Sequence, residues 1–222
     1  MTDAGVTGAG ATGSAGADAD RAAPGERARR FDALYERRID PWDFRGSDYE
    51  RAKYAATLEA LPRARYRRAV EAGCSIGELA RALAARADAT LGIDVSAVAL
   101  DEARRAHAGV PGLEFALGEL PDDWPDAPLD LAVLSEVLYY LSPGEIDALG
   151  ARVARTLEPG GHCVVVCWLG DTGEPLDGEG AADRFARALA DATGGGAERV
   201  PSIGRLDLRR TADYRLDLFE RR

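Results

Sequence analysis

Two short segments, 70–77 and 91–96, constrain the fold of this chain more than any other feature. The first is an apolar run that leads into Gly73 and Gly77, and the second is an apolar run that ends in Asp94. This order predicts a buried strand, a tight turn, a helix and a second strand that ends in a carboxylate. Glycines let the backbone approach a ligand closely, and an acid at the tip of the second strand can accept hydrogen bonds from both ribose hydroxyls. The two segments therefore predict a nucleoside site.

The turn between them does not follow the dinucleotide pattern. A dinucleotide fingerprint needs G-x-G-x-x-G, whereas here Ser75 stands at the middle glycine and Gly77 comes one residue early. An acid, Glu71, stands two residues before Gly73, so the pattern is E-x-G-x-x-x-G, similar to that of S-adenosylmethionine (SAM) methyltransferases. We expect Glu71 to orient the loop or to reach the methionine ammonium. The alternative is a glycine-containing turn of some other α/β protein.

Composition narrows the classes of partner. The chain has 222 residues and a formal net charge of −10, which argues against nucleic acid as the partner. It has no apolar run of about 18 residues, so we expect no membrane span, and its N-terminus lacks the pattern of a secretory signal. Three cysteines without such a signal indicate reduced thiols and a cytoplasmic protein. The two histidines, His107 and His162, have no ligand-like spacing, so we expect no metal.

Strand-like and helical patterns alternate through the middle of the chain. Ser96 and Ser142 fit the N-caps of two of the helices. Cys163 and Cys167 would share one face of their strand as core residues. The alternation predicts a mostly parallel sheet with helices on both faces. The predicted strands lie near 68–73, 89–94, 112–117, 129–135 and 161–168, and the predicted helices near 76–87, 96–107 and 143–157.

The C-terminal segment departs from a dinucleotide fold. A helix near 179–192 precedes two strand-like runs, at 198–208 and 214–220, and no helix fits between these runs. The two runs should therefore pair antiparallel. We predict an α/β fold of the Rossmann-like class I methyltransferase type: a mostly parallel seven-stranded sheet with an antiparallel C-terminal strand and an N-terminal helical lid.

The N-terminal region divides into a tail and two helices. The tail is rich in Ala and Gly with almost no large apolar side chain, which predicts disorder. Apolar residues at helical spacing predict a first helix, which ends before Pro41. Ser47, with Glu50 three residues later, predicts a capping box at the start of a second helix. We therefore expect three parts: a disordered tail at 1–25, lid helices at 26–62 and a SAM-binding methyltransferase domain at 63–222.

Several motifs taken together resemble the nodulation protein S family, a branch of the class I SAM-dependent methyltransferases. The resemblance spans about residues 31–220. The founding members N-methylate the deacetylated terminal amine of a chito-oligosaccharide signal, but many others have no assigned substrate, so the resemblance implies the reaction better than the acceptor. The motifs are Asp40-Pro41-Trp42, Ser47-x-Tyr49-Glu50-Arg51, Gly73-Cys74-Ser75-Ile76-Gly77, Pro121-Asp122-Asp123-Trp124-Pro125, Leu134-Ser135-Glu136-Val137 and Leu157-Glu158-Pro159-Gly160-Gly161-His162.

The resemblance also implies which residues hold SAM. The turn after the first strand would wrap the methionine half, and Asp94 would hold the ribose diol. In the strand at 161–168, Cys167 stands where we expect a histidine in many relatives, which leaves the acceptor undefined. The remaining assignments are Gly73, Cys74, Ser75 and Ile76 in the turn, Val95, Glu119 and Leu120 near the adenine, Ser135 beneath the sulfonium, Arg51 at the SAM carboxylate and Trp42 over the site.

Glu136 and Tyr140 are the candidates for the chemistry. Methyl transfer is an in-line displacement, so the protein mainly supplies alignment and a dry pocket. An amine must be neutral when it attacks, and a nearby carboxylate can take its proton. Glu136 follows a central strand, at the edge where open α/β sheets bind ligands; alternatively, it braces the next helix. Of Tyr139 and Tyr140, we expect one in the core and the other, Tyr140, at the acceptor pocket.

The sequence therefore predicts a cytoplasmic SAM-dependent methyltransferase of a small molecule, an amine or amino sugar first and a hydroxyl second. A non-catalytic SAM-binding module would need the same pocket and stays open. An NAD-dependent oxidoreductase would need a pair such as Tyr-x-x-x-Lys. Tyr139 and Tyr140 are followed four residues on by Pro143 and Gly144, and Lys53 is the only lysine.

Overall fold

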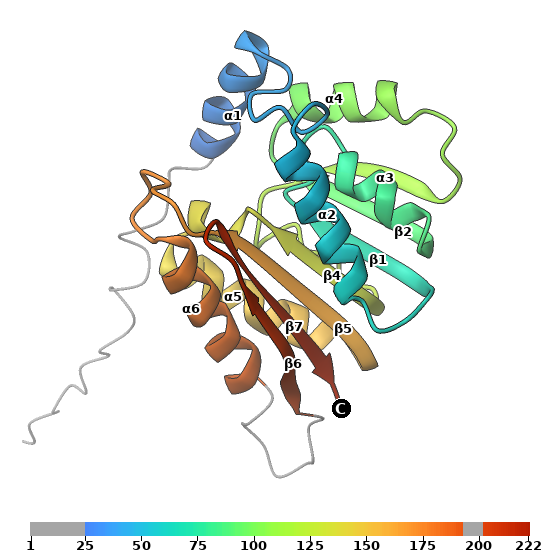
Figure 1. Cartoon of the computed structure of the whole chain (residues 1–222), viewed down its shortest axis with the longest axis vertical. Helices are drawn as coiled ribbons and strands as arrows, with labels where there is room; N and C mark the ends of the chain where they lie inside the picture. Colours follow the sequence, from blue (N-terminus) through green and yellow to red (C-terminus); the bar gives the residue numbers. More distant parts are fainter. Residues whose placement is uncertain (1–24, 193–201) are drawn as a thin grey trace, which may run out of the picture.

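One seven-stranded sheet organises the chain. The computed structural model describes residues 25–192 and 202–222 (Figure 1). The strands stand in the order β3-β2-β1-β4-β5-β7-β6; β1 to β5 run parallel, and β7 pairs antiparallel with both β5 and β6. This arrangement confirms the predicted fold. The strands are β1 (Tyr66–Ala72), β2 (Ala87–Asp94), β3 (Leu113–Leu117), β4 (Leu129–Ser135), β5 (Leu157–Trp168), β6 (Ile203–Arg210) and β7 (Tyr214–Arg221).

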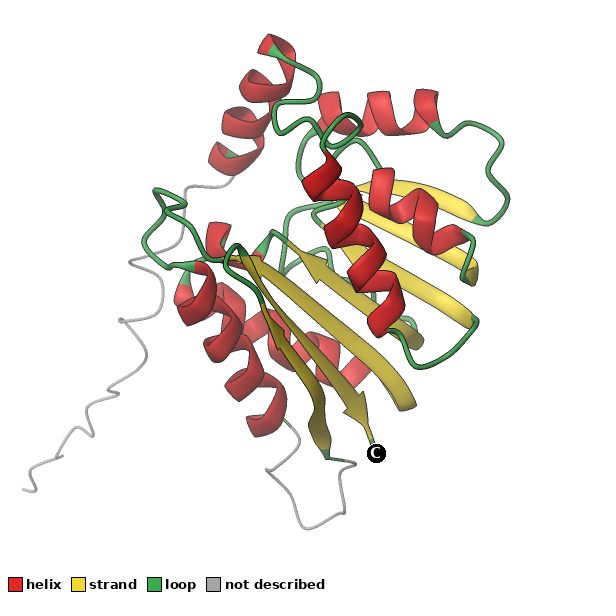
Figure 2. Cartoon of the chain, in the orientation of Figure 1, coloured by secondary structure: helices red, strands yellow, loops and turns green. Residues whose placement is uncertain are grey.

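Helices cover both faces of this sheet (Figure 2). Successive residues of a strand point to opposite faces, so Leu131 and Val133 of β4 pack with α2 and α3, whereas Ala132 and Leu134 pack with α5 and α6. Cys163 and Cys167 are fully buried on one face of β5, as predicted. The helices are α1 (Glu26–Arg37), α2 (Asp48–Ala60), α3 (Glu78–Ala84), α4 (Ala97–Ala106), α5 (Pro143–Thr156) and α6 (Gly178–Asp191), with a 3₁₀ turn η1 (Leu138–Tyr140).

The helix starts follow the predicted caps with one exception. The hydroxyls of Ser96 and Ser142 accept hydrogen bonds from the third residue of their helices, and Ser142 forms a complete capping box. At α2 only half of the predicted box forms. The Ser47 hydroxyl accepts from the Glu50 N–H (3.3 Å), but the Ser47 N–H donates to the Asp43 carbonyl (2.8 Å). The Glu50 carboxylate is therefore not needed at the cap.

Two boundaries differ from the prediction. β5 starts at Leu157 rather than at 161, because Leu157 already pairs with Leu129 and the strand continues through an irregularity in register. α3 is shorter than 76–87, because Gly77 has φ 82° and the helix starts only after it. The start of the run at 198 and the tail at 1–24 lie outside the described residues. Within 25–192 and 202–222, no helix is both long and apolar enough to span a membrane.

The two N-terminal helices are attached near the carboxyl ends of β1 and β2. Asp32 of α1 accepts a hydrogen bond from the Ser96 hydroxyl (2.6 Å) at the start of α4. Arg45, between α1 and α2, pairs with Glu78 of α3 (2.9 Å) and Glu102 of α4 (2.7 Å). These contacts hold the segment expected to be a lid against the edge of the sheet where open α/β folds bind ligands.

Candidate active site

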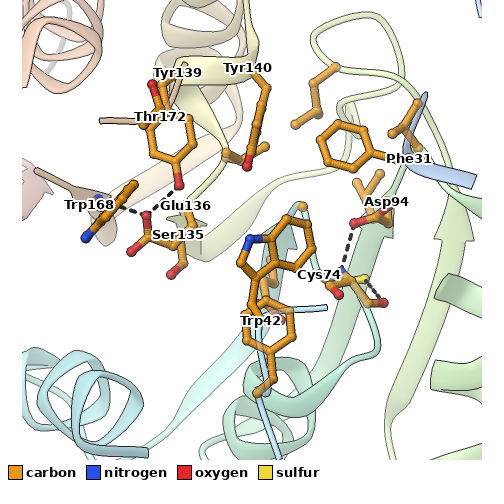
Figure 3. Close-up of a pocket in the computed structure, with 18 of the residues that line it drawn as sticks. Phe31, Trp42, Cys74, Asp94, Ser135, Glu136, Tyr139, Tyr140, Trp168 and Thr172 are labelled. Atoms are coloured by element: carbon orange, nitrogen blue, oxygen red, sulfur yellow. Dashed lines mark hydrogen bonds between the residues drawn. The ribbon is translucent and has the colours of Figure 1, made fainter. Parts of the chain in front are cut away.

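A cavity of about 550 Å³ opens at the carboxyl ends of β1, β2 and β4, with walls that include residues of α1 and α2. This volume suits a small-molecule site. Figure 3 shows the Trp42 ring between two groups of side chains that line it. Asp94, with the turn after β1, lies on one side, and we call this the Asp94 pole. Glu136 lies on the other with Tyr139 and Trp168, and we call this the Glu136 pole.

The Asp94 pole is built on a turn that has little room for side chains. Gly73 has φ 73°, and a Cβ there would lie 2.8 Å from Val137 Cγ2. Ser75 also has a positive φ of 51°, which is uncommon for a residue other than glycine. Asp94 stabilises this backbone, because its Oδ2 accepts from the Ser75 N–H (2.8 Å) and its Oδ1 from the Ser96 N–H (2.9 Å). The turn and Asp94 are therefore one structural unit.

The two carboxyls at this pole are both buried. Burial raises the pKa of Asp94, while hydrogen bonds from backbone N–H groups oppose the rise. Glu71 is 3% exposed, and its Oε2 has no partner among the described residues. Burial raises the pKa of Glu71 well above its usual range, and the nearby Asp94 raises it further. An unpaired buried carboxyl oxygen on the cavity wall can be satisfied by a ligand that donates a hydrogen bond.

Glu136 is the centre of a hydrogen-bond network at the other pole. Its Oε1 accepts from Lys53 Nζ (2.9 Å), and its Oε2 accepts from the Tyr139 hydroxyl (2.7 Å) and the Trp168 N–H (2.8 Å). Its backbone φ is 57°. Lys53 is 3% exposed and also pairs with Glu50 Oε1 (3.0 Å). One buried cation therefore lies between two carboxylates.

Tyr139 and Tyr140 both line the cavity, although Tyr139 is also part of the core, as expected for one of the pair. The Tyr140 ring packs edge-on against Phe31 of α1, with ring centroids 5.0 Å apart. Burial raises the pKa of Tyr140 to about 12, so its hydroxyl stays protonated at neutral pH. Tyr140 can donate a hydrogen bond there, but it is not a base.

Most of the predicted site residues meet at this cavity, and three do not line it. Ile76 is fully buried beside Tyr35 in a separate core cluster. Arg51 pairs with Asp48 and donates to the Gly46 carbonyl. Glu119 pairs with Arg27 (2.9 Å). The residues that do line the cavity are Trp42, Glu71, Gly73, Cys74, Ser75, Asp94, Val95, Leu120, Ser135, Glu136 and Tyr140.

The sequence analysis missed the contribution of α2 to the Glu136 pole. Tyr49, Glu50 and Lys53 all line the cavity. One signal was present, since Lys53 is the only lysine among 28 lysines and arginines. A compact ammonium on a flexible stem suits a confined site between two carboxylates better than a planar guanidinium does.

Comparisons with known proteins agree with this geometry. Residues 69–161 match the family model described as a methyltransferase domain. A solved structure from Pseudomonas syringae, described as a methyltransferase, is 35% identical, and the match covers 78% of this chain and 99% of that one with a TM-score of 0.65. Nodulation protein S of Rhizobium tropici is 32% identical over 127 residues, which are 56% of this chain and 53% of that protein. The chain belongs to the class I SAM-dependent methyltransferases, and it is similar to NodS among them.

The match to a NodS enzyme of known structure covers most of this chain. The N-methyltransferase NodS from Bradyrhizobium japonicum WM9, solved with S-adenosyl-L-homocysteine (SAH), is 21% identical, and the match covers 86% of this chain and 97% of that one with a TM-score of 0.70. At that identity the likeness shows the fold alone. The chain spans about half the length of the curated Rhizobium relative. The activity and the acceptor of that relative are therefore not carried over to this chain.

Proposed function

We propose that this family member transfers a methyl group from SAM to a small-molecule acceptor, with an amine or amino sugar favoured over a hydroxyl. The observation that carries the proposal is a single cavity that connects the Asp94 pole with the Glu136 pole. A methyl donor and its acceptor have to meet in one space from which water is excluded. The cavity offers two chemically different ends for that purpose.

The Asp94 pole fits SAM in shape and in chemistry. Asp94 has carboxylate lone pairs beyond its two backbone bonds for a ribose diol, and the unpaired Glu71 oxygen suits the methionine ammonium. The absence of a side chain at Gly73 leaves space that a Cβ would close. Val95 and Leu120 offer apolar surface for the adenine. When bound, SAM supplies a methyl group that its sulfonium already activates.

The Glu136 pole fits an amine. Glu50 and Glu136 supply negative charge, and Tyr139, Tyr140 and Trp168 supply aromatic surface, which attracts organic cations. A neutral hydroxyl acceptor would gain a hydrogen bond from the carboxylates but no ion pair. Glu136 and Tyr140 are therefore proposed to form the acceptor side of the cavity, which Ser135 and Trp42 also line. We further propose a cytoplasmic enzyme without a nucleic-acid partner, in keeping with its net charge of −10.

Two measurements test this function. Calorimetric titration with SAM and SAH should give saturable binding at one site per chain, and a protein that binds neither contradicts the proposal. Labelled SAM should then be incubated with the protein and a panel of amines, amino sugars, alcohols and phenols, and the products identified by mass. Methylated amines are the expected result. Binding without any transfer across the panel would favour the non-catalytic module.

A further inference from the structure

Two carboxylates, Glu50 on α2 and Glu136 after β4, line the Glu136 pole, and either one could take the proton of the acceptor. We propose that Glu50 of α2 binds the acceptor amine as its ammonium ion and removes its proton, while Glu136 is a positioning residue that holds Lys53 and Tyr139. This inference rests on the proposed function. It adds which residue binds the acceptor and in which charge state the acceptor binds. Three features of the Glu136 pole support it: occupied oxygens on Glu136, a free oxygen on Glu50 and the local charge.

Glu136 is poorly placed to accept a further proton. Its two oxygens already accept from Lys53, the Tyr139 hydroxyl and the Trp168 N–H, each within 2.9 Å. Neither oxygen of Glu136 is therefore free of a partner, so an acceptor amine would have to compete with these groups for it.

Glu50 has the free capacity that Glu136 lacks. It is 6% exposed and lines the cavity, and its Oε1 accepts from Lys53 while its Oε2 has no partner among the described residues. The neighbouring Tyr49 hydroxyl also lines the cavity and is likewise unpaired. An unpaired buried polar atom is costly, so two of them from neighbouring residues that line the cavity point to a polar ligand. An ammonium or amino group satisfies the carboxylate, and an adjacent hydroxyl of the same ligand satisfies the tyrosine.

The charges around Glu50 favour a cationic ligand. Lys53 is the cation closest to it, while Glu136 and Asp40 act on Glu50 as like charges, and the Tyr49 and Tyr54 hydroxyls stay protonated because burial raises the pKa of each. Lys53 balances only one of its two carboxylate partners. Burial is the largest influence on Glu50 and raises its pKa, which makes it a better proton acceptor than an ordinary glutamate. An incoming ammonium restores the balance of charge.

Removal of a proton from the acceptor precedes transfer of the methyl group. One N–H bond of the bound ammonium breaks and an O–H bond forms on Glu50, which leaves a neutral amine. The nitrogen lone pair forms the new N–C bond as the C–S bond of the methyl donor breaks, and that electron pair stays on sulfur. The product leaves as an N-methylammonium ion, and Glu50 returns its proton to solvent.

The test compares amines with neutral counterparts of the same shape, using the full chain saturated with SAH. The probes are D-glucosamine against D-glucose and benzylamine against benzyl alcohol, titrated calorimetrically into wild type, Glu50→Gln and Glu59→Gln. Glu59 is the matched control, because it is an exposed glutamate on the same helix. We expect wild type and Glu59→Gln to bind each amine about tenfold or more tightly than its counterpart, and Glu50→Gln to lose that preference.

Saturation with SAH keeps the two hypotheses separate, since a protein that fails to bind SAH refutes the proposed function before Glu50 is tested. With SAH bound, equal affinities of wild type for amine and counterpart, no binding of either amine, or an unchanged preference in Glu50→Gln each overturns the inference. If Glu50→Gln does not fold, titrations of the wild-type protein alone test the inference. Benzylamine stays charged at neutral and acidic pH, so its affinity should weaken as acid protonates Glu50, and an affinity that does not fall even in acidic buffer overturns the inference.

Discussion

Lys53 on α2 and Glu136 after β4 form an ion pair of 2.9 Å, although 83 residues separate them along the chain. Lys53 is 3% exposed, and the side chain of Glu136 is 18% exposed. This pair attaches the second N-terminal helix to the centre of the sheet at the wall of the cavity. The attachment of α2 and the shape of the Glu136 pole therefore depend on the same two side chains.

Loss of Lys53 should destabilise the fold. Lys53→Met keeps a long flexible side chain but leaves Glu50 and Glu136 without their cation, and removal of one partner from a buried pair typically costs about 3–5 kcal/mol. Urea denaturation measures the loss in the free energy of unfolding. Arg65→Met is the control, because Arg65 and its partner Asp88 are 59% and 58% exposed, and such surface pairs contribute about 1 kcal/mol or less. Equal effects of the two substitutions would contradict the prediction.

Glu71 should make the protein less stable as the pH rises. Because its pKa is raised in the native state, the native protein holds a proton that the unfolded chain releases above the ordinary glutamate range. The free energy of unfolding then falls with rising pH, until the pH passes the raised native pKa. Glu71→Gln removes this ionisation without a change of shape. It should flatten the dependence, measured by urea denaturation at several pH values, and leave the variant more stable than wild type in alkaline buffer.

The same Glu71→Gln substitution should also weaken SAH binding, because a bound ammonium favours the ionised form of Glu71, and an amide holds an ammonium less well than a carboxylate does. Stability and affinity would then move in opposite directions in alkaline buffer. An unchanged pH slope would contradict the role of Glu71 in stability, and an unchanged affinity for SAH would contradict its role in binding.

Asp94 should carry much of the affinity for SAH. Asp94→Asn replaces an oxygen acceptor by a donor where a ribose hydroxyl and a backbone N–H both need an acceptor, and hydrogen bonds to charged groups contribute about 1.5–3 kcal/mol. We expect the dissociation constant for SAH to rise by roughly 10- to 100-fold in calorimetric titration. Asp88→Asn, on the exposed part of the same strand, should leave the affinity unchanged. A small effect at Asp94 would argue against its ribose role.

Alanine substitutions at Gly73 and Gly109 distinguish the cost of a strained backbone conformation from the cost of a steric clash. Both have a positive φ, 73° and 82°, but a Cβ at Gly73 would lie 2.8 Å from Val137 Cγ2, whereas a Cβ at Gly109 meets nothing within 4 Å. Gly109→Ala should cost only the backbone term, about 1–2 kcal/mol, and retain SAH binding. Gly73→Ala should cost more and weaken SAH binding. Thermal unfolding and SAH titration of both variants check this, and equal losses would contradict it.

The fold could be predicted because its signals are local. The strand and helix periods, the N-caps at Ser96 and Ser142, and the absence of a helix between β6 and β7 all reside in short stretches of sequence. The turn of the Asp94 pole was predictable for a similar reason. Gly73 and Asp94 end neighbouring parallel strands, and the ends of such strands meet at the same edge of a sheet.

The Glu136 pole was predictable only in part. Glu136 and Tyr140 follow β4, so their position at the cavity came from the strand order. Glu50 was interpreted as half of a capping box, since the local pattern at Ser47 is the usual one. In the structure the Ser47 N–H donates to Asp43 instead, which leaves the Glu50 side chain to face Lys53 and the cavity.

The sequence by itself determined the class of fold, the succession of helices and strands along the chain and the place of the turn at Gly73, because hydrophobic periodicity and backbone restrictions act over a few residues. Only the tertiary structure decided which side chains of α2 meet the end of β4. That contact depends on how a helix from one part of the chain packs on a sheet built from another, and the burial and pairing of Lys53, Glu50 and Glu136 arise from this packing.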